Sequence, residues 1–507
     1  MRTIIPGPPG TGKTYRLVNY YLNIELNQNK IDPKNILYVS FSKAATREAK
    51  KRIFELYPMA EVQIYTLHAF GKMHANLDTS TGLMKGKVWD KFKNFSGVDL
   101  NCESIENESG MRQYKDYRLR VIEYATNKKI RLERAQEELG LQYRTNIYDI
   151  RQIALDLKTF KKEFKMFEYS DMIKKFIENK CSPTLDVIFL DEAQDLSPLQ
   201  WEMFFRLESL CQRSYIAGDD DQAIYSFQGA DPEIFINLKG TFDAQTKSMR
   251  VPSNVHKEAK LILDSINNRM EKEWSPREGK GEVQYVVDLS NVNLSSGTWF
   301  ILTRSKRIML PIVQYLQSTG YRFDCKHQEI LSNNLLNAWR TWDRLNQSAS
   351  VTSDDAINLY TTCFRSGEGH VKHGFSSGKS LKEINSVTIE ELKKDHGLLI
   401  EGDWTQLYMT EEQKTYIKEL IRKGENLHEN ARIKVSTIHG VKGEEAENVV
   451  IYTDMEKIIY DSSRSSLTNE DTEHRVWYVG VTRAKKNLYV VSLDSQYNQY
   501  NIGGHIC

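Results

Sequence analysis

Residues 7–14 of this chain read GPPGTGKT, a pattern that can hold the phosphates of a nucleotide. Its glycines let backbone N–H groups curl around phosphate oxygens, and the N-terminus of a following helix adds a favourable partial charge. Lys13 can reach the β- and γ-phosphates, and Thr14 can give its hydroxyl to Mg²⁺. The apolar run 3–5 and the helical pattern 15–26 supply the strand and helix that such a loop requires. We therefore expect a nucleoside triphosphate to be bound by Gly7, Pro8, Pro9, Gly10, Thr11, Gly12, Lys13, Thr14 and Tyr15.

A second set of polar residues follows the apolar run 187–190, where Asp191 and Glu192 stand side by side. Asp191 could hold Mg²⁺ directly or through water, and Glu192 could act as general base toward an attacking water. Taken alone, the segment could equally be an acidic turn at the end of a strand. Beside a phosphate loop, the pair favours nucleotide hydrolysis.

A third polar turn, 218–222, follows the apolar run 214–217. The carboxamide of Gln222 could touch both the γ-phosphate and the attacking water, and could thereby sense hydrolysis. Tyr225 and Phe227 come directly afterwards, and we expect them to be exposed and to stack on the bases of a single strand. The alternative is ordinary packing of both rings in the core.

The elements that must position these residues alternate between strands and helices. The helical pattern 44–55 separates the first two strand patterns after the phosphate loop, which indicates a parallel sheet. Further strand patterns recur along the chain, so that the set after the run 3–5 is 36–41, 62–65, 187–190, 214–217, 299–302, 449–452 and 488–491. Two long, mainly helical stretches interrupt this alternation.

The bulk composition excludes several classes of protein. A chain of 507 residues is too long for one hydrophobic core, so several domains are expected. With a net charge of +1, the chain has no overall basic excess of the kind that nucleic-acid-binding proteins often show. The segment 111–165 is locally basic, with 14 Lys and Arg against 8 Asp and Glu. That segment could bind duplex phosphates, or it could be an ordinary solvated face.

The cysteines and the apolar runs argue against further classes of protein. Six cysteines lie far apart and form no C-x-x-C pair, which argues against a zinc site, an iron–sulfur site and a disulfide framework. The first residues contain no signal-peptide apolar region, and no apolar run is long enough to span a membrane. We therefore expect a soluble, intracellular (cytoplasmic) protein with no membrane contact.

Taken together, the motifs resemble those of superfamily 1 DNA helicases of the UvrD/Rep/PcrA type. Their order and rough spacing fit that family across nearly the whole chain. The segments that carry the resemblance are GPPGTGKT (7–14), VSFSKAATREAKKRI (39–53), IYTLHAFG (64–71), LDEAQD (190–195), GDDDQAIYSFQGA (218–230), KSMRVPSNV (247–255), ILTRS (301–305), VSTIHGVKGEEAENVVIY (435–452) and EHRVWYVGVTRAKKNL (473–488).

The resemblance implies an α/β fold of two RecA-like P-loop NTPase domains with parallel sheets, each carrying a mainly helical insertion. ATP would bind between the two domains. The expected boundaries are 1–75 and 179–245 for RecA-like domain 1, 76–178 for its insertion, 246–326 and 431–507 for RecA-like domain 2, and 327–430 for the second insertion.

The resemblance also implies roles for individual residues. Arg250 and Arg483 would stabilise charge on the transferred phosphoryl group, as arginine fingers do, and Glu445 would contact the ribose. The expected catalytic set is thus Lys13, Asp191, Glu192, Gln222, Arg250 and Arg483, with Thr14 and Asp191 on the metal. Contacts to single-stranded DNA are expected from Phe41, Thr66, His68, Tyr225, Phe227, Thr437 and His439.

The implied activity is that of an ATP-dependent DNA helicase, which hydrolyses ATP with Mg²⁺ to move 3′→5′ on single-stranded DNA and separate duplex strands. Its partners would be single-stranded DNA, junctions of single and double strands, and possible nuclease, repair or replication proteins. Two alternatives stay open: a translocase that unwinds weakly alone, and an ATPase subunit of a larger nuclease or replication complex. Tyr15 and Met249 replace the family's usual Arg and Tyr, which predicts a looser pocket for the base.

Overall fold

The computed structural model describes residues 1–75, 82–102, 104–106, 112–181, 183–326, 328, 330–491 and 498–503. The chain forms two compact units. Unit 1 comprises Met1–Asn293, Leu302–Arg304 and Thr437–Cys507, and unit 2 comprises Leu294–Ile301 and Ser305–Ser436. Within the described ranges, none of the helices combines the length and the apolar character that crossing a bilayer requires.

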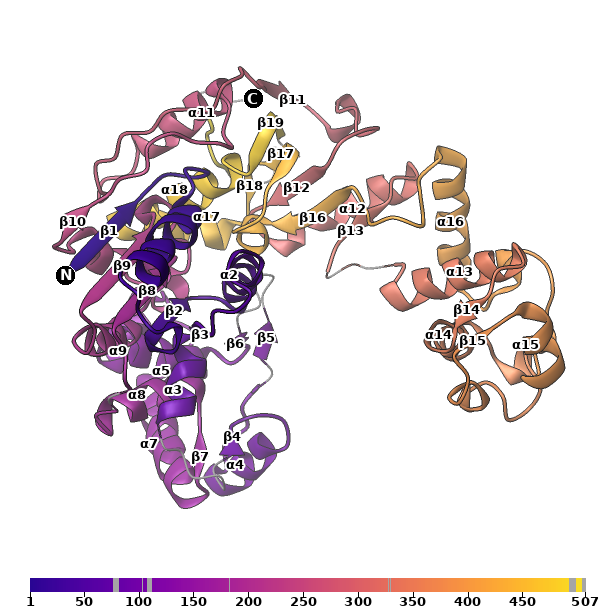
Figure 1. Ribbon diagram of the computed structural model, residues 1–507, viewed down its shortest axis with the longest axis horizontal. Helices are drawn as coiled ribbons and strands as arrows, with labels where there is room; N and C mark the ends of the chain where they lie inside the picture. Colours follow the sequence, from indigo (N-terminus) through magenta and orange to yellow (C-terminus); the bar gives the residue numbers. More distant parts are fainter. Residues whose placement is uncertain are drawn as a thin grey trace. The chain divides into compact units, whose positions relative to one another are not determined.

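Unit 1 contains a six-stranded parallel sheet with the strand order β10-β1-β9-β8-β2-β3 (Figure 1). Its strands are β1 (Arg2–Pro6), β2 (Ile36–Ser40), β3 (Gln63–Thr66), β8 (Val187–Asp191), β9 (Arg213–Gly218) and β10 (Thr241–Phe242). All the strands run the same way, so their carboxyl ends meet at one edge. That edge receives the phosphate loop after β1, Asp191 at the end of β8, and the turn after β9.

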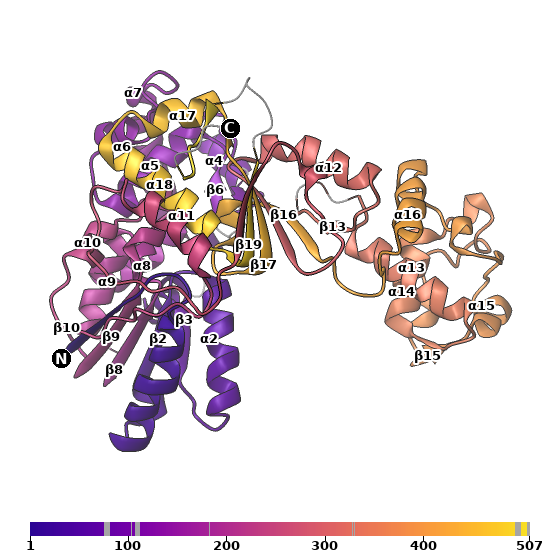
Figure 2. The same ribbon diagram turned by 90° about the horizontal axis from the view of Figure 1, so that it is seen from above.

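Alternating residues of these strands bury opposite faces of the sheet (Figure 2). On one face, Ile5 and Phe189 pack with residues of the helix after the phosphate loop and of α2 (Lys43–Leu56). On the other face, Ile4 and Leu190 pack with residues of α3, α8, α9 and α10. These four helices span Leu67–His74, Tyr169–Glu178, Pro198–Glu208 and Pro232–Ile236. Helices on both faces explain why the strands read as continuous apolar runs in the sequence.

The helix after the phosphate loop has an unusual winding. It starts as α1 (Lys13–Tyr15) and continues as two π-helical segments, η1 (Arg16–Leu22) and η2 (Ile24–Gln28). The sequence pattern 15–26 thus predicts a helix correctly but does not predict the π-type winding. Glu25 in η2 is fully buried and accepts hydrogen bonds from Arg213 Nε (2.7 Å), Arg213 Nη2 (2.9 Å), Tyr215 Oη (2.6 Å) and Asn29 Nδ2 (2.9 Å).

We expect Glu25→Ala to destabilise unit 1 by about 3 kcal/mol, because it leaves the Arg213 guanidinium without its carboxylate. Burial alone would raise the pKa of Glu25, but the hydrogen bonds from Arg213, Tyr215 and Asn29 lower it below its ordinary value. The stabilisation is therefore present at neutral pH and is lost as the pH falls below about 4.3, the value for an unfolded glutamate. Urea denaturation at pH 7 and at acidic pH measures both effects. The exposed ion pair Lys34–Glu61 provides a control, since Glu61→Ala should leave the urea midpoint unchanged.

A mainly helical segment lies between β3 and β8. It contains α4 (Val88–Ser96), α5 (Tyr117–Lys128), α6 (Leu132–Glu138), α7 (Ile147–Glu163) and α8, with two small sheets formed by β4 (Gly82–Leu83) with β7 (Met166–Phe167) and by β5 (Ser104–Glu106) with β6 (Arg112–Tyr114). Several of its basic residues are paired with carboxylates, among them Arg118 with Asp116, Arg151 with Glu133, and Lys161 with Glu168. Glu168 lies outside residues 111–165, so its pair with Lys161 offsets part of the local basic excess of that segment.

The remainder of unit 1 carries three more parallel strands, β11 (Glu282–Val286), β19 (Ala484–Val491) and β17 (Ala446–Tyr452), with β19 in the middle. Helices α11 (Ser253–Leu263) and α18 (Leu467–Val481) pack against each other. Smaller elements are α17 (Lys457–Ser463) and the pair β18 (Asp454–Met455) and β20 (Asn498–Gln499). Short 3-10 turns of unit 1 are η3 (Pro33–Asn35), η4 (Ala193–Asp195), η5 (Asp220–Gln222), η6 (Ser226–Gln228), η7 (Leu289–Asn291) and η12 (Ile438–Val441).

Unit 2 is built mainly from helices around one apolar core that includes Trp342, Tyr360 and Leu420. Its helices are α12 (Met309–Ser318), α13 (Asn333–Asn346), α14 (Ser353–Cys363), α15 (Ile389–Asp395) and α16 (Glu411–Lys423) (Figure 1). Strand β13 (Phe323–Asp324) pairs in parallel with β16 (Ile433–Thr437), and β14 (Val351–Thr352) pairs antiparallel with β15 (Ser386–Val387). Its 3-10 turns are η8 (Lys306–Ile308), η9 (Ser366–Glu368), η10 (Lys379–Leu381) and η11 (Trp404–Gln406).

Strand β12 (Trp299–Thr303) belongs to unit 2 up to Ile301 and to unit 1 from Leu302. The α/β fold with parallel sheets is as the sequence predicts. The six-part division into two RecA-like domains and two insertions stays a prediction.

Candidate active site

The phosphate loop is shaped by two glycines with left-handed backbone. Gly10 has φ 75° and Gly12 has φ 84°, a region that side chains with a Cβ rarely adopt. A Cβ at Gly10 would also lie 2.5 Å from Cβ of Arg250, so only glycine fits there. Lys13 is buried, and its Nζ donates a hydrogen bond to the carbonyl oxygen of Gly7 at 2.7 Å. Burial lowers the pKa of Lys13.

A distant segment, residues 248–250, docks onto this loop. Ser248 Oγ donates to the carbonyl oxygen of Pro9 at 2.8 Å, and the amide of Met249 donates to the carbonyl oxygen of Gly10 at 2.8 Å. The amide of Arg250 in turn donates to Ser248 Oγ at 3.2 Å. Ser248 thus fixes the backbone that carries Arg250. This serine could not be predicted from the sequence, because its only signal is its position two residues before the arginine.

Thr14 and Asp191 lie together at the carboxyl edge of the sheet. Thr14 Oγ1 donates to Asp191 Oδ2 at 2.8 Å, and Tyr38 Oη donates to the same oxygen at 2.9 Å. Burial, together with the nearby charge of Glu192, raises the pKa of Asp191 to about 6. A buried carboxylate beside a hydroxyl is an oxygen donor set of the kind that Mg²⁺ prefers, and a cation would relieve the repulsion from Glu192. The residues present therefore fit the predicted metal.

Glu192 adopts a left-handed backbone conformation with φ 56°, and its amide donates to Asp191 Oδ1 at 3.0 Å. Gln194 Nε2 donates to Glu192 Oε2 at 2.5 Å. Burial would raise the pKa of Glu192, but the positive charges of Lys442 and Lys13 lower it below its ordinary value. Glu192 is therefore ionised at neutral pH and can accept a proton.

Gln222 and Arg483 are in direct contact. Arg483 Nη2 donates to Gln222 Oε1 at 2.9 Å, and Gln222 Nε2 donates to Asp219 Oδ2 at 2.7 Å. Burial, and then the like charge of Arg250, lower the pKa of Arg483 to about 9. A polyanion bound beside Arg483 would lower the free energy of this buried cation.

Arg250 and Glu445 form an ion pair. Arg250 Nε lies 2.5 Å from Glu445 Oε2, and Lys485 Nζ lies 3.0 Å from Glu445 Oε1. All six predicted catalytic residues, together with Gly10, Gly12, Thr14, Tyr15 and Glu445, line one hollow of about 710 Å³. The structure thus brings together residues that are far apart in the chain, such as Lys13 and Arg483, which are 470 positions apart. The individual roles of these residues stay predictions.

Lys442 is a further charged residue at this hollow that sequence analysis did not single out. Its Nζ lies 2.7 and 2.5 Å from the two carboxylate oxygens of Asp195, and it donates to the carbonyl oxygen of Gln222 at 2.6 Å. It also lies 4.8 Å from the ring centroid of Tyr225. Lys442 therefore joins the acidic turn after β8 to the turn that carries Gln222.

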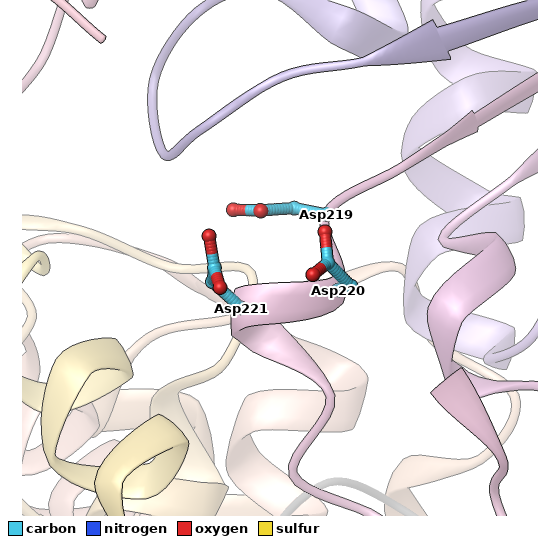
Figure 3. Close-up of side chains that lie close together, drawn as sticks. All are labelled: Asp219, Asp220 and Asp221. Atoms are coloured by element: carbon cyan, nitrogen blue, oxygen red, sulfur yellow. The ribbon is translucent and has the colours of Figure 1, made fainter. Parts of the chain in front are cut away.

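Three consecutive carboxylates, Asp219, Asp220 and Asp221, lie close together (Figure 3). Gln222 follows them directly in the chain. Three buried carboxylates could suit a metal ion, but Lys272 Nζ ion-pairs with all three, at 2.9 Å from Asp219 and 2.8 Å from Asp221. Arg269 adds two hydrogen bonds to Asp221, at 2.8 and 2.7 Å. Since these side chains already supply the positive charge, we assign no metal to this cluster.

Residues 2–243 match the sequence family described as the UvrD/REP helicase N-terminal domain. These 242 of the 507 residues are similar to that family. The resemblance to UvrD/Rep-type helicases that the motifs indicate is therefore confirmed, and with it the α/β class of the fold.

Relatives similar to the chain over most of its length carry related names. A probable DNA helicase II homolog of Mycoplasma pneumoniae is 24% identical, over 99% of this chain and 82% of the relative. A probable DNA helicase II homolog of Rickettsia conorii is 22% identical, over 97% and 90%. The putative ATP-dependent DNA helicase YjcD of Bacillus subtilis is 22% identical, over 95% and 75%.

The predicted DNA-contacting aromatic residues form a cluster with His439. Phe41 stacks on Tyr225 with ring centroids 5.5 Å apart, and Phe227 meets His439 edge-on at 5.6 Å. Tyr225 is only 4% exposed, so the expectation that it is exposed was wrong. The rings of Phe41 and Phe227 are half-buried. Lys442 and Phe41 cover Tyr225, which a local sequence pattern could not reveal.

The other predicted DNA contacts have structural partners in the protein. The hydroxyl of Thr66 accepts from the amide of Ala69 at 3.2 Å, and that of Thr437 accepts from Gly440 at 3.3 Å. Burial lowers the pKa of His68 to about 4, and burial with the charge of Arg304 lowers that of His439 to about 3. Both imidazoles are therefore neutral at physiological pH. Contacts of these residues with DNA stay predictions.

Proposed function

We propose that this protein is an ATP-dependent DNA helicase, which hydrolyses ATP to move 3′→5′ along single-stranded DNA and separate duplex strands. The observation that carries the proposal is the contact between Arg483 and Gln222 at 2.9 Å, in the hollow that Lys13, Asp191 and Glu192 also line. The UvrD/REP family match and the helicase names of the relatives support the choice of DNA unwinding as the use of this ATPase.

The positions of these side chains suggest a separate role for each of them during hydrolysis. Lys13 would leave the carbonyl of Gly7 for the phosphates of ATP. Thr14 and Asp191 would hold Mg²⁺, whose chemistry there is to neutralise charge on the phosphate oxygens. Glu192 would take the proton of the attacking water. Arg250 and Arg483 would stabilise the charge that develops on the transferred phosphoryl group.

The turn that carries Gln222 would connect the site of hydrolysis to the residues that are predicted to contact DNA. Gln222 lies three residues before Tyr225, and Lys442 contacts the backbone of the first and the ring of the second. A change at Gln222 when the γ-phosphate leaves would therefore act on the cluster of Phe41, Tyr225, Phe227 and His439. Stacking of bases on such rings is independent of sequence and contributes about 1–3 kcal/mol per base.

One observation favours a second candidate function, a translocase or an ATPase subunit of a nuclease or replication complex that unwinds weakly alone. The helical segment that could grip duplex phosphates has many of its cations already paired with carboxylates, as in Arg118–Asp116, Arg151–Glu133 and Lys161–Glu168. Paired cations release fewer counterions from DNA, so the grip on a duplex would be weaker.

The test is ATP-driven strand separation of two matched duplexes, one with a 3′ single-stranded tail and one with a 5′ tail. Separation of the 3′-tailed substrate alone supports the proposal, whereas separation of the 5′-tailed substrate alone contradicts the polarity. ATP hydrolysis stimulated by single strands without separation of either duplex favours the second candidate. The variant Lys13→Ala serves as control and should separate neither substrate while still binding single strands.

We further expect a weak preference among nucleotide bases. Tyr15 is 60% exposed and Met249 is 76% exposed beside the phosphate loop, and both offer an apolar or aromatic surface for a base. Stacking does not distinguish bases, whereas sites that hydrogen-bond a substrate group reject analogues by about 10⁴–10⁵-fold. The kcat/KM values for GTP and CTP should therefore lie within about tenfold of that for ATP.

Steady-state kinetics with the three nucleotides measures this preference. Tyr15→Ala should raise KM for all three nucleotides, and Tyr20→Ala, which alters an exposed ring stacked with Arg16, should not. Strict dependence on ATP would contradict the expectation of a loose base pocket.

A further inference from the structure

Among the described contacts, Lys272 makes no direct hydrogen bond to any of the six predicted catalytic residues. Its side chain is nevertheless almost fully buried near them. Its side chain is 3% exposed, and its Nζ ion-pairs with Asp219, Asp220 and Asp221. Asp219 directly follows β9, and Asp220 and Asp221 are the first two residues of η5. Three carboxylates so close together repel one another, and the cation of Lys272 offsets that repulsion.

The members of this cluster have different further partners. Asp221 accepts two hydrogen bonds from Arg269, and Asp220 accepts one from the amide of Met270 at 2.7 Å. Asp219 instead accepts a hydrogen bond from Gln222 Nε2 at 2.7 Å. Asp219 is therefore the member that connects Lys272 to the candidate active site.

The orientation of the Gln222 carboxamide depends on this connection. With Nε2 toward the carboxylate of Asp219, Oε1 faces the guanidinium of Arg483 at 2.9 Å. The flipped amide would place its oxygen against a carboxylate and its N–H groups against a guanidinium, which only donates. The carboxylate of Asp219 therefore favours this orientation, and Lys272 holds that carboxylate in place at 2.9 Å.

We propose that Lys272 is a positioning residue for ATP hydrolysis, which acts through Asp219 to hold the Gln222 carboxamide toward Arg483. The inference rests on the proposed role of Gln222 in hydrolysis. It also makes Lys272 and the neighbouring Met270 part of the support of the active site, because Lys272 binds Asp219 and the amide of Met270 binds Asp220 in the turn that carries Gln222.

The experiment measures kcat for DNA-stimulated ATP hydrolysis, the Kd for a fluorescent ATP analogue and the melting temperature of the full chain. The variants are Lys272→Met, Asp219→Ala and Gln222→Ala, and the doubles that combine Gln222→Ala with each of the other two. We expect Lys272→Met and Asp219→Ala each to lower kcat by about 10–100-fold with little change in Kd, since small misplacements of catalytic groups cost up to about 10²-fold.

Asp221→Ala is the matched control. It removes another carboxylate partner of Lys272, but Asp221 has no hydrogen bond to Gln222 among the described contacts. Its kcat should stay within about twofold of wild type, and Lys272→Arg, which keeps the charge, should recover part of the activity lost in Lys272→Met. In the Gln222→Ala background, Lys272→Met and Asp219→Ala should have no further effect on kcat, as expected for residues that act through Gln222.

The outcomes separate this inference from the proposed function. If Gln222→Ala retains full kcat, the role of Gln222 in the proposed function is wrong. If Gln222→Ala slows hydrolysis but Asp219→Ala does not, or if Asp219→Ala lowers kcat equally in both backgrounds, the inference is overturned and the proposed function stands. Should Lys272→Met fail to fold, the Asp219→Ala pair of measurements decides the question by itself.

Discussion

Arg483→Ala is expected to lower kcat for ATP hydrolysis by about 10³-fold or more, within the range known for removal of an arginine finger. The guanidinium is buried, contacts Gln222, and lies close enough to Arg250 for that charge to lower its pKa. In such surroundings a cation interacts strongly with a developing negative charge, because little water screens it. The rate of phosphate release in the presence of single-stranded DNA measures this change in kcat.

Arg483 also has a structural role that the experiment must separate. Its Nε donates to the carbonyl of Val479 at 2.9 Å and its Nη1 to that of Glu444 at 3.2 Å. Arg483→Lys keeps the charge but cannot make all three contacts, so we expect intermediate activity. A melting temperature close to wild type, combined with retained ATP binding, assigns the loss to catalysis. Normal kcat in a folded Arg483→Ala protein would remove this residue from the catalytic set.

Glu192→Gln is expected to bind ATP normally but to lower kcat by about 10²–10⁴-fold, as removal of a general base does. Glutamine keeps the size of the side chain and can still meet Gln194, but it cannot accept the proton of the attacking water. Single-turnover hydrolysis and filter binding of labelled ATP measure the two steps separately.

Glu48→Gln is the matched control for this substitution. Glu48 lines the same hollow, but its carboxylate is exposed and pairs with Arg52 on α2. Its removal should leave kcat within about twofold of wild type. If Glu192→Gln turned over at the normal rate, another group would have to be the base.

Sequence reasoning could predict the residues that line the hollow because parallel topology fixes where strand ends meet. The loop after β1, the carboxylate pair after β8 and the turn after β9 must share one edge once the sheet is parallel. Arg250, Glu445 and Arg483 could be predicted only from the family resemblance, since nothing local in the sequence places them near residue 13.

Lys272 and Lys442 show what the sequence could not supply. Each is one lysine among many, and its partners lie about 50 and about 250 residues away in the chain. Their importance comes from burial next to carboxylates, which no periodicity reports. The burial of Tyr225 likewise depends on residues far away in the chain, Phe41 and Lys442.

The hydrogen bond from Lys13 to the carbonyl of Gly7 has a kinetic consequence. This bond holds the phosphate loop around the side chain of Lys13, and hydrogen bonds from residues 248–250 hold the loop from its other side. An arriving nucleotide then exchanges one partner of the lysine for another and does not have to order a disordered segment, so little conformational entropy is lost on binding. Association with ATP should accordingly be a single fast step whose rate rises linearly with nucleotide concentration, without a slow phase of loop rearrangement.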